Sequence, residues 1–141
     1  MLVDTNVLID VLEDDPVWAN WSLSALRRQA QVHRLIINPV IYAELSFAFS
    51  TMEALDEVLH TLALPLQPLP KPALFLAGKA FAQYRKRGGT KHSVLADFFI
   101  GAHAAVEGIS VLTRDPRRYR TAFPRLRLVT PSGTAPYGAK P

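Results

Sequence analysis

The sequence predicts an α/β fold in which helices cover both faces of a central, mostly parallel sheet of four to five strands. Short apolar runs alternate along the chain with longer stretches of helical periodicity, and this alternation is typical of doubly wound parallel sheets. The chain has 141 residues, 49% of them hydrophobic and 20% charged, which suffices for one core. We therefore expect a single domain over residues 1–130 and a flexible tail over residues 131–141.

Four short apolar runs have the length and composition of strands. They are MLVD at 1–4, RLIIN at 34–38, ISVLT at 109–113 and LRLVT at 126–130. The run LPLQPLP at 64–70 allows a short edge strand at best, because its three prolines cannot donate hydrogen bonds to a neighbouring strand.

Between these runs, apolar residues recur at helical spacing. The spacing predicts helices over residues 5–13, 16–31, 39–49, 51–63, 72–87 and 92–107, with a short helix or turn over 115–123. Pro39 suits the first turn of its helix, and Gly88-Gly89 separates the helix 72–87 from the next one. Asp10 belongs to the polar face of the first helix, so we expect it to lie at the surface.

The charge is divided unevenly along the chain. Residues 1–70 carry three basic and nine acidic residues, a net charge of −6, whereas residues 71–141 carry thirteen basic and three acidic residues, a net charge of +10. Such an excess favours a polyanionic partner, and the lack of a lipid-anchoring signal favours nucleic acid over a membrane. A solvated basic surface explains the charge equally well. Cysteine is absent, and neither a signal peptide nor a membrane-spanning run is evident, which fits a cytoplasmic protein.

Two acidic residues follow predicted strands. Asp4 ends the first strand, and Asp115 stands two residues past the run SVLT. Because parallel α/β sheets bind ligands beyond the carboxyl ends of their strands, both positions are candidates for a site. Each also has a structural explanation: Asp4 could cap the first helix, and an aspartate before a proline commonly starts a turn.

Two further acids lie on predicted helices among apolar or small residues. Glu44 is the only charge in the helix 39–49, where a carboxylate on the apolar face is costly unless it is paired or binds a metal. Its same-face neighbours are Val40, Ile41, Phe47 and Ala48. Those of Asp97 are Ser93, Gly101 and Ala104, which leave space for an ion and a phosphate but also permit tight helix packing. The structural alternatives are a helix-edge glutamate that reaches water and an aspartate favoured by the helix dipole.

Four carboxylates gathered at one edge of a sheet would repel one another and raise their own pKa values. A divalent cation relieves that repulsion. Because the ligands are hard oxygens and the chain has no cysteine and no paired histidines, the sequence favours Mg²⁺ or Mn²⁺ over zinc.

Four segments resemble the signature blocks of the PIN domain and are most similar to those of the VapC toxins of bacterial and archaeal toxin–antitoxin pairs. They are VDTNVLID, the glutamate within NPVIYAEL, LADFFIGAHA and LTRDPRRYRTAFPRLRLV, in the expected order and spacing from residue 1 to about 130. Ala96 stands where relatives often have proline, a departure without chemical consequence. The resemblance implies a PIN-like doubly wound fold and metal-dependent ribonuclease activity. It assigns the acidic cluster to Asp4, Glu44, Asp97 and Asp115.

The implied reaction is hydrolysis of RNA phosphodiester bonds with one or two Mg²⁺ ions, or Mn²⁺, held by these four acids. Asp4 and Asp97 would be the strongest ligands, with Glu44 and Asp115 direct or water-bridged. Three polar residues could orient carboxylates, contact phosphate or serve as caps and turn residues, namely Thr5, Asn6 and Thr113. The RNA backbone would be held by Arg114, Arg117, Arg118, Arg120 and the run 85–87. Tyr119 could stack on a base or belong to the core.

The resemblance also implies two protein partners: a small cognate VapB-like antitoxin and a second copy of the chain. Candidate apolar contact positions on the helices 16–31 and 39–62 include Trp18, Trp21, Phe49 and Met52, which could equally be core residues. The antitoxin's tail would fold along the surface formed by these helices and place a basic side chain among the carboxylates. The alternative function is a non-catalytic RNA- or protein-binding domain on the same fold, against which the complete set of acids argues.

Overall fold

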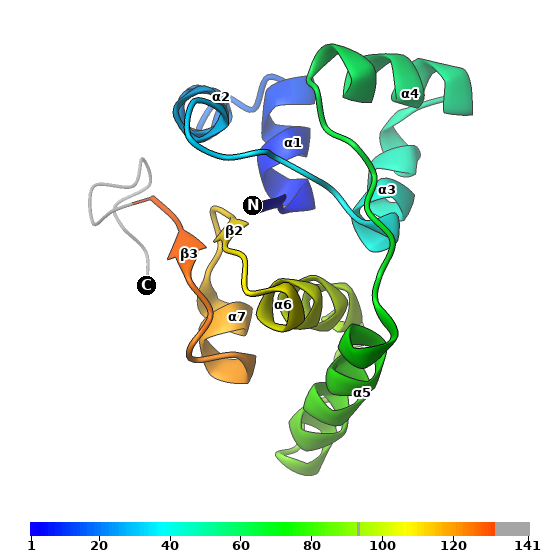
Figure 1. Ribbon diagram of the computed structural model, residues 1–141, viewed down its shortest axis with the longest axis vertical. Coiled ribbons are helices and arrows are strands. Elements are labelled where there is room, and N and C mark those ends of the chain that lie inside the picture. The colour runs from blue at the N-terminus through cyan, green and yellow to red at the C-terminus, as the bar shows by residue number, and fades with distance from the viewer. Residues whose placement is uncertain (93, 132–141) are drawn as a thin grey trace.

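The computed structural model describes residues 1–92 and 94–131 (Figure 1). The tail expected from residue 131 onward therefore lies outside the described residues, apart from Pro131 itself. The helices are α1 (Thr5–Leu12), α2 (Ala19–Ala30), α3 (Pro39–Leu45), α4 (Met52–Thr61), α5 (Lys71–Lys86), α6 (Leu95–Glu107) and α7 (Arg117–Ala122), with a 3₁₀ helix η1 (Ser46–Ala48). The strands are β1 (Leu2–Val3), β2 (Val111–Leu112) and β3 (Leu128–Val129). In the described part of the chain, no helix is long and apolar enough to cross a membrane.

The sheet is parallel, in the order β1-β2-β3, with Leu2 opposite Val111 and Val111 opposite Leu128. It continues on the other side of β1 through two isolated parallel bridges, from Leu2 to Ile36 and from Ile37 to Leu66. The parallel α/β prediction is confirmed, but only three of the four to five expected strands are regular within the described residues.

The two other expected strands are reduced to single bridges for a physical reason. Ile36 donates its backbone N–H to Met1, whereas Ile37 donates to Pro65 on the other side. The segment 64–70 then supplies few further donors, because Pro65, Pro68 and Pro70 have no backbone N–H. The pairing on that edge therefore stops after one bridge.

The helix expected over residues 39–49 ends earlier. Asn38 caps α3 by accepting the backbone N–H groups of Val40 and Ile41, with Pro39 in the first turn. The chain tightens after Leu45 into η1, and the change from 3.6 to 3 residues per turn rotates the following side chains away from the apolar face. Phe47 is consequently 93% exposed, and Ala48 is exposed too, so the prediction that they share a buried face with Glu44 is wrong.

Two hydrophobic clusters hold the domain together. The larger one packs the strands against α1, α3 and α4, with Leu2, Leu8, Ile41, Leu55 and Leu112 among its fully buried members. The smaller one lies between α5, α6 and the residues after α7, and includes Ala77, Phe98 and Phe123. Figure 1 shows α5 beside α6, at the end of the molecule away from α2 and α4.

Of the four apolar residues considered for partner contacts, Trp18 is a core residue. It is only 5% exposed, and its ring meets Trp21 edge to face at 6.2 Å. Trp21 and Phe49 are partly buried against the larger cluster, whereas Met52 is 63% exposed. Large exposed apolar side chains in this region include Phe47, Met52 and Val17.

Candidate active site

The carboxyl ends of β1 and β2 lie side by side, and the side chains that follow them open onto one cavity. Asp4 follows β1, the segment Thr113–Asp115 follows β2, and Asp97 lies in the first turn of α6. The cavity has a volume of about 310 Å³ and is lined by Asp4, Asn6, Lys91, Asp97, Asp115, Arg117, Arg118 and Thr121. Three of the four predicted acids thus face the same space, and Glu44 lies beside it on α3.

Asp4 is 4% exposed and is oriented by residues from the other end of the chain. Its Oδ2 accepts hydrogen bonds from the Thr113 hydroxyl and the Tyr119 hydroxyl, both at 2.8 Å, and from Asn6 Nδ2 at 3.4 Å. Burial raises the pKa of Asp4, and the bonds from Tyr119 and Thr113 oppose that rise. Within the described residues, the Asp4 carboxyl lies near the backbone N–H groups of Thr5 and Asn6 at the start of α1, but it forms no well-aligned capping hydrogen bond there.

Tyr119 is a core residue rather than a surface for base stacking. Its side chain is 1% exposed and its hydroxyl donates to Asp4, so the ring is not accessible to a nucleotide. Thr113 and Asn6 contact each other at 3.2 Å and both contact Asp4, which gives them the carboxylate-orienting role that the sequence left open.

Glu44 is half-buried at the end of α3. The Thr5 hydroxyl donates to Glu44 Oε1 at 2.5 Å, so Thr5 also orients a carboxylate. Burial raises the pKa of Glu44, and the nearby charge of Asp4 adds to the effect. The buried Asn38 connects α3 to α6, since its Nδ2 lies 3.2 Å from His103 Nδ1, and this contact fixes the helix of Glu44 against that of Asp97.

Asp97 lies within electrostatic reach of the other three acids of the site. Burial, followed by the charges of Asp4 and Glu44, raises its pKa to about 7, while the positive charge of Arg118 acts in the opposite direction. The predicted space beside it is not confirmed. A Cβ added to Gly101 would lie 2.5 Å from the Phe123 ring, so this glycine serves close packing, and Ser93 lies outside the described residues.

Asp115 is held by a neighbouring arginine. Arg117 donates from Nε to Oδ1 at 2.8 Å and from Nη2 to Oδ2 at 2.7 Å, a bidentate pair at the rim of the cavity. These hydrogen bonds lower the pKa of Asp115. Arg117 therefore neutralises one acid of the cluster, a contact that the sequence analysis did not anticipate.

Asp10 is not a surface residue, contrary to the prediction. It is 1% exposed because α2 covers that face of α1, and it accepts from Arg114 Nε at 2.7 Å and from the Ser22 hydroxyl at 2.8 Å. The guanidinium of Arg114 also lies over the Trp18 ring, 5.5 Å from its centroid. Arg114 thus anchors the segment after β2 to α1 and α2, and its expected contact with RNA is not supported.

The donor set fits a hard divalent cation. It consists of carboxylate and hydroxyl oxygens, with Asp4, Asp97 and Asp115 on one cavity. Burial, together with the charges of Asp4 and Glu44, raises the pKa of Asp97. Among the residues that the structure describes, however, no three carboxylate or imidazole groups converge closely enough to hold one ion as they stand. One reason is that Asp115 is engaged by Arg117 instead of pointing its carboxylate at a position shared with the other acids.

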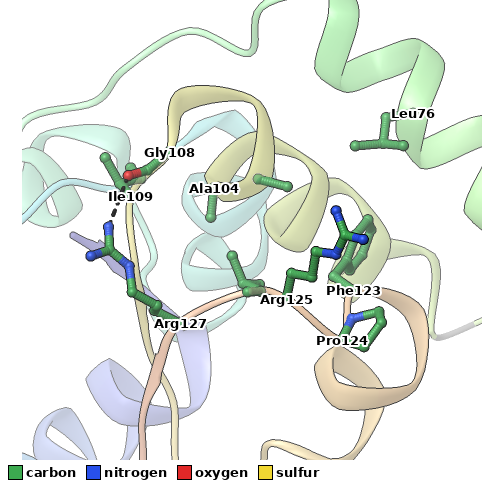
Figure 2. A pocket seen from close by; sticks show the side chains of 10 residues that line it. Leu76, Ala104, Gly108, Ile109, Phe123, Pro124, Arg125 and Arg127 are labelled. Atoms are coloured by element: carbon green, nitrogen blue, oxygen red, sulfur yellow. Dashed lines mark hydrogen bonds between the residues drawn. The ribbon is translucent and has the colours of Figure 1, made fainter.

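A second cavity, of about 570 Å³, lies near the opposite end of β2 (Figure 2). Its walls include Leu76, Ile109 and Phe123, with Arg125 and Arg127 beside them, and Arg127 donates to the Gly108 carbonyl at 3.1 Å. It has no carboxylate among its lining residues. This cavity is therefore no candidate for metal-dependent chemistry.

The fold and the cavity place this chain among the parallel α/β proteins that have a carboxylate-lined site at the carboxyl ends of their strands. The family model of the PIN domain matches residues 1–124, and the chain belongs to the PIN domain family. This confirms the resemblance seen in the four sequence segments. No curated protein matches the sequence.

Solved structures with this fold include several complexes from bacteria. Similar chains occur in VapBC2 from Rickettsia felis bound to a promoter DNA fragment (TM-score 0.69, 19% identity, 92% of this chain and 96% of that chain). They also occur in FitAcB from Neisseria gonorrhoeae (TM-score 0.61, 20% identity, 90% and 94%) and in a toxin–antitoxin complex from Klebsiella pneumoniae (TM-score 0.62, 19% identity, 92% and 95%). At these identities the likeness shows the fold.

Proposed function

We propose that this chain is a metal-dependent endoribonuclease that hydrolyses RNA phosphodiester bonds and acts as the toxin of a toxin–antitoxin pair. The crowding of Asp4, Glu44, Asp97 and Asp115 carries the proposal, because a carboxyl whose pKa is raised to about 7 by burial and by neighbouring carboxylates favours the binding of a cation. Membership of the PIN domain family and the likeness to chains of toxin–antitoxin complexes support it.

In the proposed reaction, Asp4 and Asp97 would hold Mg²⁺ or Mn²⁺, with Glu44 and Asp115 as direct or water-bridged ligands. Such an ion, when bound, lowers the pKa of a water molecule and stabilises a departing oxyanion. The protein's own contribution is orientation. Thr113 and Tyr119 fix one oxygen of Asp4, and Thr5 fixes one oxygen of Glu44.

We further propose that a small VapB-like antitoxin controls this activity and that the chain forms a homodimer. Two exposed apolar side chains, Phe47 and Met52, offer a contact surface next to the helix of Glu44. A partner bound at this surface would contact Phe47, which is three residues after Glu44 of the acidic cluster in the sequence. Expression of the chain alone should arrest growth, the product of the neighbouring small gene should rescue it, and Asp97→Asn should not arrest growth.

The direct test is cleavage of total RNA by the purified protein. We expect cleavage with Mg²⁺ or Mn²⁺, none with EDTA, and losses of about 100-fold or more in Asp4→Asn and Asp97→Asn. Glu107→Gln is the matched control, because Glu107 is an exposed acid at the far end of the same helix as Asp97. Unchanged cleavage in both aspartate variants would refute the assignment. RNA binding without cleavage in the wild type would instead support the non-catalytic alternative.

A further inference from the structure

The arginines that follow β2 differ in what they contact. Arg114 is paired with the buried Asp10, and Arg117 is paired with Asp115. Arg118 lines the carboxylate cavity, yet among the described residues it forms no ion pair with any acid. The charge of Arg118 thus remains available to a ligand that enters the cavity.

The guanidinium of Arg118 is incompletely satisfied by the protein. Its Nε is buried and has no hydrogen-bond partner within the described part of the chain. A buried N–H without an acceptor costs about 1–3 kcal/mol, so such groups are rare unless a bound ligand or water supplies the acceptor. A guanidinium presents its N–H groups as a planar fork that matches two oxygens of a phosphate.

Tyr84, on α5, holds Arg118 at the cavity. The guanidinium lies over its ring, 5.5 Å from the centroid. The ring itself is fixed by Phe81 at 6.0 Å and Phe98 at 5.7 Å, and its hydroxyl accepts the backbone N–H of Lys91 at 3.0 Å. Lys91 lines the same cavity, so one aromatic side chain positions both cations.

The loop after α5 is shaped for this contact. A Cβ added to Gly89 would lie 2.4 Å from the Tyr84 ring, so a larger residue at this position would displace the ring. Gly89 therefore lets the backbone pass directly over Tyr84 and brings Lys91 to the cavity. The same loop and ring would be disturbed together by any side chain at residue 89.

We propose that Arg118 binds an RNA phosphate beside the acidic cluster, that Lys91 adds a second positive charge there, and that Tyr84 is the positioning residue for both. This inference rests on the proposed ribonuclease function and separates Arg118 from the other arginines of the segment. Arg118 places a fixed positive charge where the phosphodiester must approach four carboxylates, and it offsets their repulsion of the RNA backbone.

The test measures RNA binding and cleavage separately. Binding of a labelled single-stranded RNA is measured at several salt concentrations in the Asp97→Asn protein, with and without Arg118→Gln. Loss of one phosphate contact should lower the log–log salt slope by about 0.7 and weaken binding at low salt about tenfold. Arg125→Gln removes an equal charge at the opposite cavity and should leave the slope unchanged.

Two further variants identify the role of geometry. Arg118→Lys keeps the charge and loses the fork, so we expect a nearly unchanged salt slope but cleavage lowered about 100-fold in the otherwise wild-type protein. Tyr84→Leu should reproduce the smaller salt slope of Arg118→Gln, whereas Tyr84→Phe should keep most of the wild-type slope because it keeps the ring.

Equal slopes in Arg118→Gln and Arg125→Gln would overturn the proposal, as would wild-type cleavage by Arg118→Lys. Weakened binding of the antitoxin with unchanged RNA binding would also overturn it, because Arg118 would then recognise an acidic protein partner. Absence of cleavage in the wild-type protein would refute the ribonuclease function itself, so the two failures are distinguishable.

Discussion

Replacing Asp97 with asparagine should stabilise the metal-free protein at neutral and alkaline pH. Burial and the charges of Asp4 and Glu44 raise the pKa of Asp97 from 3.8 to about 7. Between these values the folded state binds a proton that the unfolded state has released. The free energy of unfolding therefore falls as the pH rises from about 4 to about 7 and stays low above that range. Because asparagine does not ionise, the free energy of unfolding of Asp97→Asn does not fall in this way.

The expected size follows from the displacement of the pKa. Stability changes by about 1.36 kcal/mol for each pH unit between the unfolded and folded pKa values. A rise from pH 5 to pH 8 crosses the last two of these units and should cost the wild type about 2.7 kcal/mol relative to Asp97→Asn. For a chain of this size, that corresponds to a difference in Tm of roughly 8 °C.

The assay is urea unfolding with EDTA present, at pH 5 and pH 8. Asp115→Asn is the control from the same cavity. Its hydrogen bonds with Arg117 lower the pKa of Asp115, so its contribution to stability is already complete at pH 5 and is lost only on further acidification. A stability difference between wild type and Asp97→Asn that is the same at both pH values would refute the electrostatic crowding of the acids.

Three other substitutions test the contacts around the site. Asp10→Asn breaks a buried ion pair and should cost about 3–5 kcal/mol in urea unfolding, whereas Arg117→Gln at the rim should cost less than about 1 kcal/mol; equal costs would contradict the burial of Asp10. Tyr119→Phe removes one donor to Asp4 and should weaken Mn²⁺ binding, measured by calorimetry, about tenfold or more; unchanged affinity would leave the hydroxyl a purely structural role. Gly101→Ala should lower stability by about 1–3 kcal/mol in thermal unfolding because its Cβ meets the Phe123 ring, and a neutral effect would show that the ring moves freely.

Much of the fold follows from local patterns. Short apolar runs and helical periodicity predict parallel α/β architecture, and the position of an acid at a strand end predicts that Asp4 and Asp115 face one cavity. The edge strands are less predictable, because the number of bridges at Ile37 depends on which donors the proline-rich segment 64–70 retains. Local patterns thus predict which elements form, and of which type, better than they predict how long each element is.

The contacts that orient the site cannot be read from one segment at a time. Asp10 looks solvent-facing on a helical wheel, and only the packing of α2 over α1 shows that it is buried. Arg114, the partner of Asp10, lies 104 residues further along the chain. Tyr119, which donates to Asp4, lies 115 residues beyond that acid. Pairings over such distances depend on sheet order, which periodicity does not encode.

The long separation between Asp4 and its partners also has a consequence for synthesis on the ribosome. Asp4 emerges first, whereas Thr113 and Tyr119, which fix its carboxylate, are 109 and 115 residues further along. At about 5–20 residues per second, the nascent chain exists for roughly 5–20 seconds before these donors are made. Fragments that stop short of β2 contain Asp4, Glu44 and Asp97 but lack both donors. Under the proposed ribonuclease function, we expect the chain to be inert throughout most of its own translation, and we expect prematurely terminated chains that lack both donors to be inert as well.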